Sequence, residues 1–179
     1  MVTNTQQEYL NVDDVVRAFN RCFSIDGVRL QGGAEEPFFR PAGGGHDTAT
    51  IHFRADYVRS ALHEVAHWCH AGPQRRLLPD YGYWYSPDDR SVEEQAAFFA
   101  VEARPQALER FFCESLGIRF APSVDNLSLD ISEQDLSAFR SRLDRAYKHY
   151  EQCGLPERAS RFIEVLAAIT APPTNHVEE

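Results

Sequence analysis

Residues 61–72 of the chain read Ala-Leu-His-Glu-Val-Ala-His-Trp-Cys-His-Ala-Gly. His63 and His67 stand four positions apart, and Glu64 follows the first of them. On a helix, positions i and i+4 lie on one face, so two imidazole nitrogens can turn toward a single ion. The run therefore indicates a helix that holds a metal ion.

The apolar residues around this run have helical spacing. They recur at intervals of three and four positions, at Val58, Ala61, Leu62, Val65, Ala66 and Cys69. This stripe predicts an amphipathic helix that begins near Asp56 and ends at Gly72. At about 100° per residue, His63, His67 and His70 lie on the side opposite the stripe. Besides a metal site, two interpretations remain open: a solvated polar face, and histidines that pair with a neighbouring helix.

The residues before this helix predict another helix and a small sheet. Asn11 is expected to cap an amphipathic helix that runs to Phe23. Residues 28–30, 37–40 and 50–53 are short apolar runs between glycine clusters, which is typical of strands. We therefore expect a small antiparallel sheet that leads into the histidine helix.

The rest of the chain is predicted to be helical. Residues 91–94 form a capping box that opens a helix, and Pro105 is expected to kink or break that helix. Ser132 is expected to cap the next helix, which ends at Gly154, and Pro156 to open the last one. The whole pattern predicts an α+β fold that is mainly helical.

Length and composition predict a single globular domain at residues 1–171, followed by a loose tail at residues 172–179. Hydrophobic residues make up 43% of the chain and aromatic residues 12%, which argues against disorder. The net charge of −9 argues against nucleic acid or an anionic membrane as a partner.

The sequence also predicts a cytoplasmic protein. The first residues carry no basic segment with an apolar run behind it, and no stretch approaches the roughly 20 apolar residues of a spanning helix. The cysteines are far apart and form no CxxC pair; they are Cys22, Cys69, Cys113 and Cys153. We expect reduced thiols rather than disulfides or a cysteine-rich zinc site.

A catalytic ion usually has three protein ligands, so the two histidines need a partner. Glu102 is the best candidate, because it lies among apolar residues one turn before Pro105, and a carboxylate in such a segment needs a partner if it is buried. His70 shares the face of His63 but lies about 10 Å along the axis from it. We therefore expect His70 to support the site or to lie at the surface.

The other acidic residues of the same region are expected to be solvated; they are Glu93, Glu94 and Glu109. Residues 73–90 are expected to form a loop with four aromatic residues among positions 81–85. Tyr83, Trp84 and Tyr85 either line a cleft or attach the loop to the core by their rings.

Two histidines and one carboxylate suit two chemistries. A zinc ion makes a hydrolase, in which Glu64 is the general base on a bound water. Non-haem iron with the same donors makes an oxygenase with positions open for dioxygen. The five-residue motif alone favours a gluzincin-type peptidase, with Tyr83 beside the oxyanion. A binding module with a structural metal is disfavoured, because such sites are closed and cysteine-rich, and Cys69 lies on the wrong face.

Longer strings add a resemblance to a known family. Beyond the histidine run and Ala71-Gly72, they are residues 75–76, 80–85, 87–88, 101–102, 105–108, 125–127, 156–158 and 161–163. On these strings the chain resembles the elongation factor P hydroxylase family from about residue 9 to residue 170. The resemblance implies a bacterial cytoplasmic enzyme that hydroxylates a lysine of elongation factor P already extended with β-lysine.

The family pattern implies His63, His67 and Glu102 as metal ligands in a surrounding that is zincin-like. It shifts the expected reaction from peptide cleavage to hydroxylation by Fe(II) and dioxygen, with zinc as a possible substitute. Rings of Tyr83, Trp84 or Tyr85 would then hold the cationic lysine. Glu64 would orient a ligand or pair with that cation.

Overall fold

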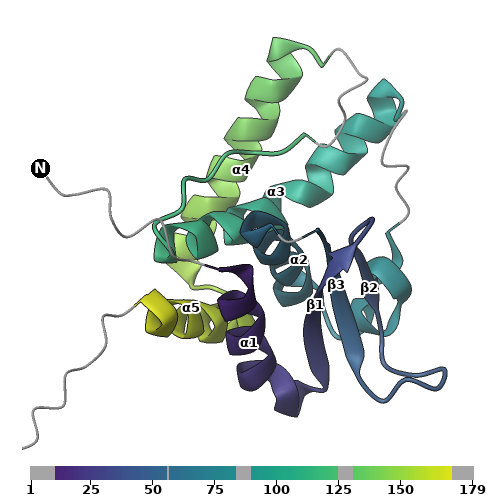
Figure 1. Cartoon of the computed structure of the whole chain (residues 1–179). Helices are drawn as coiled ribbons and strands as arrows, with labels where there is room; N and C mark the ends of the chain where they lie inside the picture. The colour runs from purple at the N-terminus through teal and green to yellow at the C-terminus, as the bar shows by residue number, and fades with distance from the viewer. Residues whose placement is uncertain (1–10, 56, 84–89, 125–130, 171–179) are drawn as a thin grey trace, which may run out of the picture.

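The computed structural model describes residues 11–55, 57–83, 90–124 and 131–170 (Figure 1). The described α-helices are α1 (Val12–Phe23), α2 (Val58–His70), α3 (Val92–Ser115), α4 (Glu133–Cys153) and α5 (Glu157–Thr170). The strands are β1 (Val28–Ala34), β2 (Phe38–Arg40) and β3 (Ala49–Arg54). Short 3-10 turns are η1 (Ser24–Asp26), η2 (Arg75–Leu77) and η3 (Pro79–Gly82). The predicted α+β class is confirmed, while the domain limit at residue 171 stays a prediction, because residues 171–179 lie outside the described part.

The sheet has the order β1-β3-β2 and is mixed rather than antiparallel. β2 is antiparallel to β3, with Phe39 opposite Ile51, but β1 is parallel to β3, with Leu30 opposite the same Ile51. The expectation of an all-antiparallel sheet is therefore wrong for one pair. After β1 the chain reverses into β2 without pairing with it. β3 lies between β1 and β2 in the sheet and runs in the same direction as β1.

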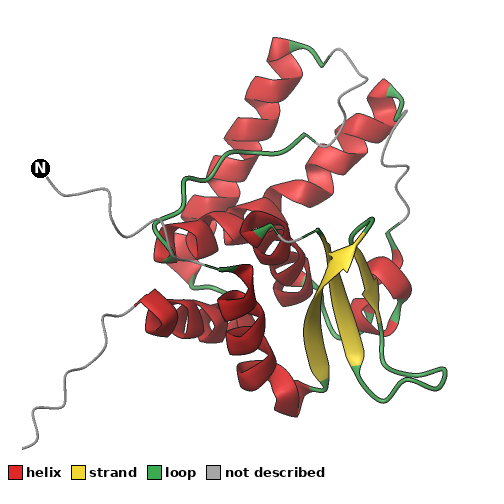
Figure 2. Cartoon of the chain, in the orientation of Figure 1, coloured by secondary structure: helices red, strands yellow, loops and turns green. Residues whose placement is uncertain are grey.

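One face of the sheet is covered by helices. Leu30, Ile51 and Phe53 point from it into the core, where α1 contacts β1 and α2 contacts β3. Figure 2 shows the sheet at one edge of the molecule with these helices beside it. Aromatic rings fill the junction of α1, α2 and α5; the Phe19 ring centroid lies 5.6 Å from those of both Trp68 and Phe162. The apolar side of α2 is thus packed in the core, and its histidine side faces α3.

The last turn of α2 is held by two arginines. The predicted start at Asp56 lies outside the described residues, and the helix begins at Val58 after Tyr57. At its other end the chain turns extended at Ala71. Arg158 Nη2 donates to the Ala71 carbonyl oxygen at 2.8 Å, and Arg76 donates to the same oxygen. Cations there complement the negative end of the helix dipole and satisfy its free carbonyls.

Pro105 does not break α3, which continues from Val92 to Ser115. A proline removes only one donor from the ladder, and the burial of its neighbours holds the helix together on both sides. Figure 1 shows the axis of α3 bending along its length, as expected for a helix that contains proline. It packs on α4 through the Phe99–Phe139 and Phe111–Tyr147 stacks, and it also contacts α2. Within the described ranges, no helix is both long enough and apolar enough to cross a membrane.

Candidate metal centre

α2 turns His63 and His67 toward α3, off its own apolar stripe. The Nε2 atoms of the two rings lie 3.1 Å apart, and the ring centroids are 4.7 Å apart at 76°. Both side chains are partly exposed, at 24% and 13%. The two histidines are therefore neither core residues nor part of a free solvated face. Their nitrogens converge at the junction between two helices.

Glu102 reaches this junction from α3, where it is buried among apolar neighbours. One carboxylate oxygen lies 3.5 Å from His63 Nε2, and the other lies 3.2 Å from His67 Nε2. Gln106, one turn later on α3, donates to the carboxylate at 3.3 Å and so fixes its rotation. The structure brings together the three residues that the sequence selected.

The three side chains have the spacing of a metal site. A donor atom from each residue lies within 4.8 Å of the others, and we call the three residues the triangle. The two histidine Nε2 atoms are 3.1 Å apart, and the Glu102 carboxylate faces one of them with each oxygen, at 3.2 and 3.5 Å. Donors about 2.1 Å from a zinc ion are about 3.0 Å apart in octahedral and about 3.4 Å apart in tetrahedral geometry. The contacts of 3.1 to 3.5 Å among the three side chains are thus in the range expected for ligands of one divalent ion.

The charges around the triangle favour a cation at its centre. Burial opposes protonation of the His63 ring, but the hydrogen bond to Glu109 and the charge of Glu102 outweigh it and raise the pKa of His63 to about 10. Burial also opposes ionisation of Glu102, yet the neighbouring His67 and His63 lower its pKa to about 2. The Glu102 carboxylate thus favours a positive group beside it, such as the proton on the His63 ring. A divalent ion at the same place would carry more positive charge than that proton.

Glu109 was expected to be solvated, and that expectation is wrong. Its side chain is only 2% exposed, and one oxygen lies 3.0 Å from His63 Nδ1. The other oxygen accepts from Arg59, at 3.0 Å from Nε and 2.6 Å from Nη2. The sequence did carry a signal, because Glu109 follows Glu102 by two helical turns and Arg59 precedes His63 by one.

Glu64 does not belong to the converging group. It follows His63 on α2 and is partly exposed, and it is not one of the three residues whose donor atoms converge. Burial of the carboxyl group raises the pKa of Glu64, although His63 and His67 act in the opposite direction.

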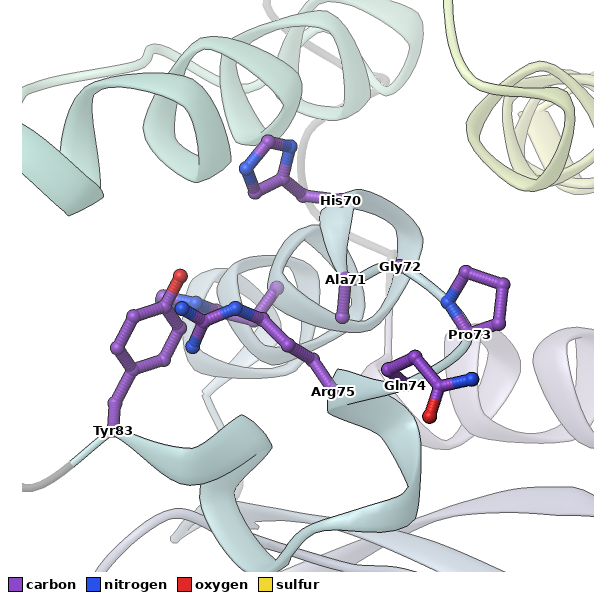
Figure 3. Close-up of a pocket in the computed structure, with 8 residues that line it drawn as sticks. His70, Ala71, Gly72, Pro73, Gln74, Arg75 and Tyr83 are labelled. Atoms are coloured by element: carbon purple, nitrogen blue, oxygen red, sulfur yellow. The ribbon is translucent and has the colours of Figure 1, made fainter.

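A cavity of about 340 Å³ opens beside His67 (Figure 3). Tyr83 lines it, and the Arg75 guanidinium carbon lies 4.3 Å from the centroid of the Tyr83 ring. His70 lines the cavity from the end of α2, with its Nδ1 atom 3.4 Å from the Tyr150 hydroxyl. Burial and the charge of Arg104 lower the pKa of His70 to about 4, so this ring is neutral. Trp84 and Tyr85, predicted with Tyr83 to contact substrate, lie outside the described residues.

Tyr81 is a further residue of the site that sequence reasoning placed only in an aromatic loop. It is buried, its ring stacks on Phe39 with centroids 4.4 Å apart, and it lies parallel to the His67 ring at 6.3 Å. Asp80 and Tyr81 both have left-handed backbones, with φ of 46° and 57°. Asp80 holds this turn by accepting from the Phe39 backbone N–H at 2.7 Å. Such strain persists only where surrounding contacts fix it, and it is enriched at functional sites.

Comparison with known proteins gives the arrangement a context. A family model described as elongation factor P hydroxylase matches residues 18–179. The chain is also similar to the elongation factor P lysine hydroxylase of Haemophilus influenzae. The two are 40% identical over 158 residues, which is 88% of each chain. The chain belongs to the elongation factor P hydroxylase family.

The family resemblance expected from the sequence is thus confirmed. In this member of the elongation factor P hydroxylase family, the matched region contains every residue of the triangle and both members of the Glu109–Arg59 pair. The cavity beside His67 and the aromatic turn at Tyr81 lie in the same region.

Proposed function

We propose that this protein is a metal-dependent hydroxylase of a protein lysine. The proposed substrate is the lysine of elongation factor P that carries a β-lysyl group, in the cytoplasm and without nucleic acid or membrane as partner. The observation that carries the proposal is the triangle of His63, His67 and Glu102 in a chain of the elongation factor P hydroxylase family.

The donor set supports Fe(II) as the working metal. Two histidines and one carboxylate that leave other positions open are the ligands of non-haem iron oxygenases, in which iron supplies the binding and activation of dioxygen. Zinc fits the same donors but has no redox chemistry. We therefore expect zinc to fill the site without supporting hydroxylation.

The protein's own residues would present the lysine to this centre. The cavity beside His67 is lined by Tyr83, and Arg75 covers one face of that ring. We expect rings of Tyr83, Trp84 or Tyr85 to hold the cationic lysyl group by cation–π contact. Glu64, which follows His63 in the chain, would pair with the ammonium group or orient a metal ligand.

The same triangle supports one alternative, a gluzincin-type zinc peptidase. There Glu64 would be the general base that takes a proton from water, and it would be indispensable. In the hydroxylase, Glu64 has a supporting role. Glu64→Gln separates the two ideas: loss of all activity together with peptide cleavage by the zinc-loaded wild type favours the peptidase, while a partial loss of hydroxylation favours the hydroxylase.

The test of the proposal is the intact mass of β-lysylated elongation factor P. Incubation with the protein, iron, a reductant and air should add the mass of one oxygen atom. His63→Ala should abolish that gain, since it removes one corner of the triangle. His149→Ala is the matched control, because His149 is an exposed histidine on α4. A gain that survives His63→Ala would refute the metal site.

A further inference from the structure

Behind the triangle, the buried Glu109 and the partly exposed Arg59 form an ion pair that the proposed chemistry does not use directly. Glu109 lies on α3, and its carboxylate contacts the ring nitrogen of His63 that faces away from the triangle. Arg59 lies on α2, one turn before His63, and donates two hydrogen bonds to the other carboxylate oxygen. Arg59 also donates to the Ala121 carbonyl oxygen at 2.8 Å, so it ties α2 to α3 and to the segment after it.

The chemistry of this pair fixes the proton on His63. A guanidinium only donates hydrogen bonds, and a carboxylate only accepts them. Arg59 occupies Oε1 of Glu109, so Oε2 is the acceptor left for His63 Nδ1. When the ring is neutral, as metal binding requires, its one proton is therefore held on Nδ1, and the lone pair of Nε2 faces His67 and Glu102.

We propose that Glu109, oriented by Arg59, is a positioning residue that sets the His63 tautomer and thereby the affinity of the site for its metal. The inference rests on the proposed metal site and deepens it. Removal of a carboxylate that orients a ligating histidine costs roughly 10–100-fold in metal affinity.

Glu109→Gln tests the tautomer with almost no change of shape. The single amide oxygen of Gln can serve either Arg59 or His63, but not both. Arg59 has only donors, so it takes the oxygen, and the amide NH₂ then faces Nδ1 of His63. That nitrogen must become an acceptor, which moves the proton to Nε2 and withdraws the lone pair from the triangle.

Removal of the competing arginine should reverse the effect. In the double variant Arg59→Met with Glu109→Gln, the amide is free to turn its oxygen toward His63, and the proton returns to Nδ1. Arg59 is partly exposed, so methionine can replace its stem without an empty core.

The experiment measures zinc affinity by competition with a chromophoric chelator, alongside the ¹⁵N resonances of the His63 ring. Glu109→Gln should bind zinc roughly 10–100-fold more weakly, with Nδ1 unprotonated, and the double variant should recover both properties. Glu93→Gln on the exposed first turn of α3 is the control for loss of one negative charge, and it should match wild type.

Each outcome is decisive. Equal zinc affinity in wild type and folded Glu109→Gln overturns the inference, and weaker binding with Nδ1 still protonated overturns it in favour of a purely electrostatic effect. If Glu109→Gln does not fold by circular dichroism, the double variant decides, since it must bind zinc like wild type with Nδ1 protonated. A wild type that binds no zinc would instead refute the metal site itself.

Discussion

One carboxylate oxygen of Glu102 lies 3.2 Å from the Nε2 atom of His67, although the two residues come from different helices. The contact joins the two-histidine motif to a third donor and makes a site from a helix face. It also explains why a carboxylate is buried at this position of α3, because the imidazole groups or a metal ion offset the cost of burying it.

Glu102→Gln should therefore weaken metal binding much more than it weakens the fold. The amide keeps the shape and the contact with Gln106 but removes the negative charge that a divalent ion needs. We expect a loss of roughly 100-fold in zinc affinity, equivalent to about 2.7 kcal/mol. Chelator competition measures it, with Glu93→Gln as the exposed control on the same helix. Unchanged affinity would remove Glu102 from the ligand set.

Metal binding should release protons. With its pKa raised to about 10, His63 carries a proton on both ring nitrogens at neutral pH, and the Nε2 proton must leave before that atom can bind metal. Affinity should therefore rise with pH up to about 10 and should fall about tenfold per unit below that value. Titration calorimetry at pH 7 in buffers of different ionisation enthalpy should give about one proton released per ion. Identical heats in all buffers would contradict the prediction.

The buried hydroxyl of Tyr81 predicts an unusual effect on stability. It has no hydrogen-bond partner within the described residues. Tyr81→Phe should leave the free energy of unfolding unchanged or raise it by about 1 kcal/mol, because an unpaired buried hydroxyl is removed. Tyr81→Ala should lower it by about 3–5 kcal/mol through loss of the Phe39 stack. Urea unfolding checks both. A clear loss of stability in Tyr81→Phe would mean that the hydroxyl is paired.

Tyr83 should contribute through its ring rather than its hydroxyl. Tyr83→Ala is expected to raise KM for elongation factor P roughly tenfold, since a cation–π contact is worth about 1–2 kcal/mol when it is desolvated. Tyr83→Phe should change KM little. Tyr57→Ala, at an exposed ring before α2, is the control. Equal KM values for Tyr83→Ala and wild type would place the substrate elsewhere.

Local signals in the sequence predicted most of the fold. Helix ends are fixed by short-range hydrogen bonds, and Asn11 and Ser132 cap α1 and α4 as expected. The Ser91–Glu94 capping box is also present. The parallel pairing of β1 with β3 was not predictable, because strand order depends on contacts across the whole chain rather than on the pattern within each strand.

A residue of the site was predictable from the sequence where a side chain suited to metal binding stood among unlike neighbours. Glu102 stood out because it lies among apolar residues, which makes a buried carboxylate conspicuous. Glu109 did not, because Arg110 follows it and Glu114 is close, so its segment looks like a solvated face. Its role depends on Arg59 and His63 from another helix, and on the angle at which α2 and α3 meet. The left-handed turn at Tyr81 was not predictable for the same reason, since tertiary contacts hold it.

The most direct test of the account is metal replacement in one enzyme preparation. Metal-free protein would be loaded under anaerobic conditions with Fe(II) or with Zn²⁺, then given β-lysylated elongation factor P, a reductant and air. We predict that the iron-loaded protein adds one oxygen atom to the intact mass of the substrate, while the zinc-loaded protein binds its metal equally well and adds none. Hydroxylation by the zinc-loaded protein, or none with stoichiometric iron, would contradict the account.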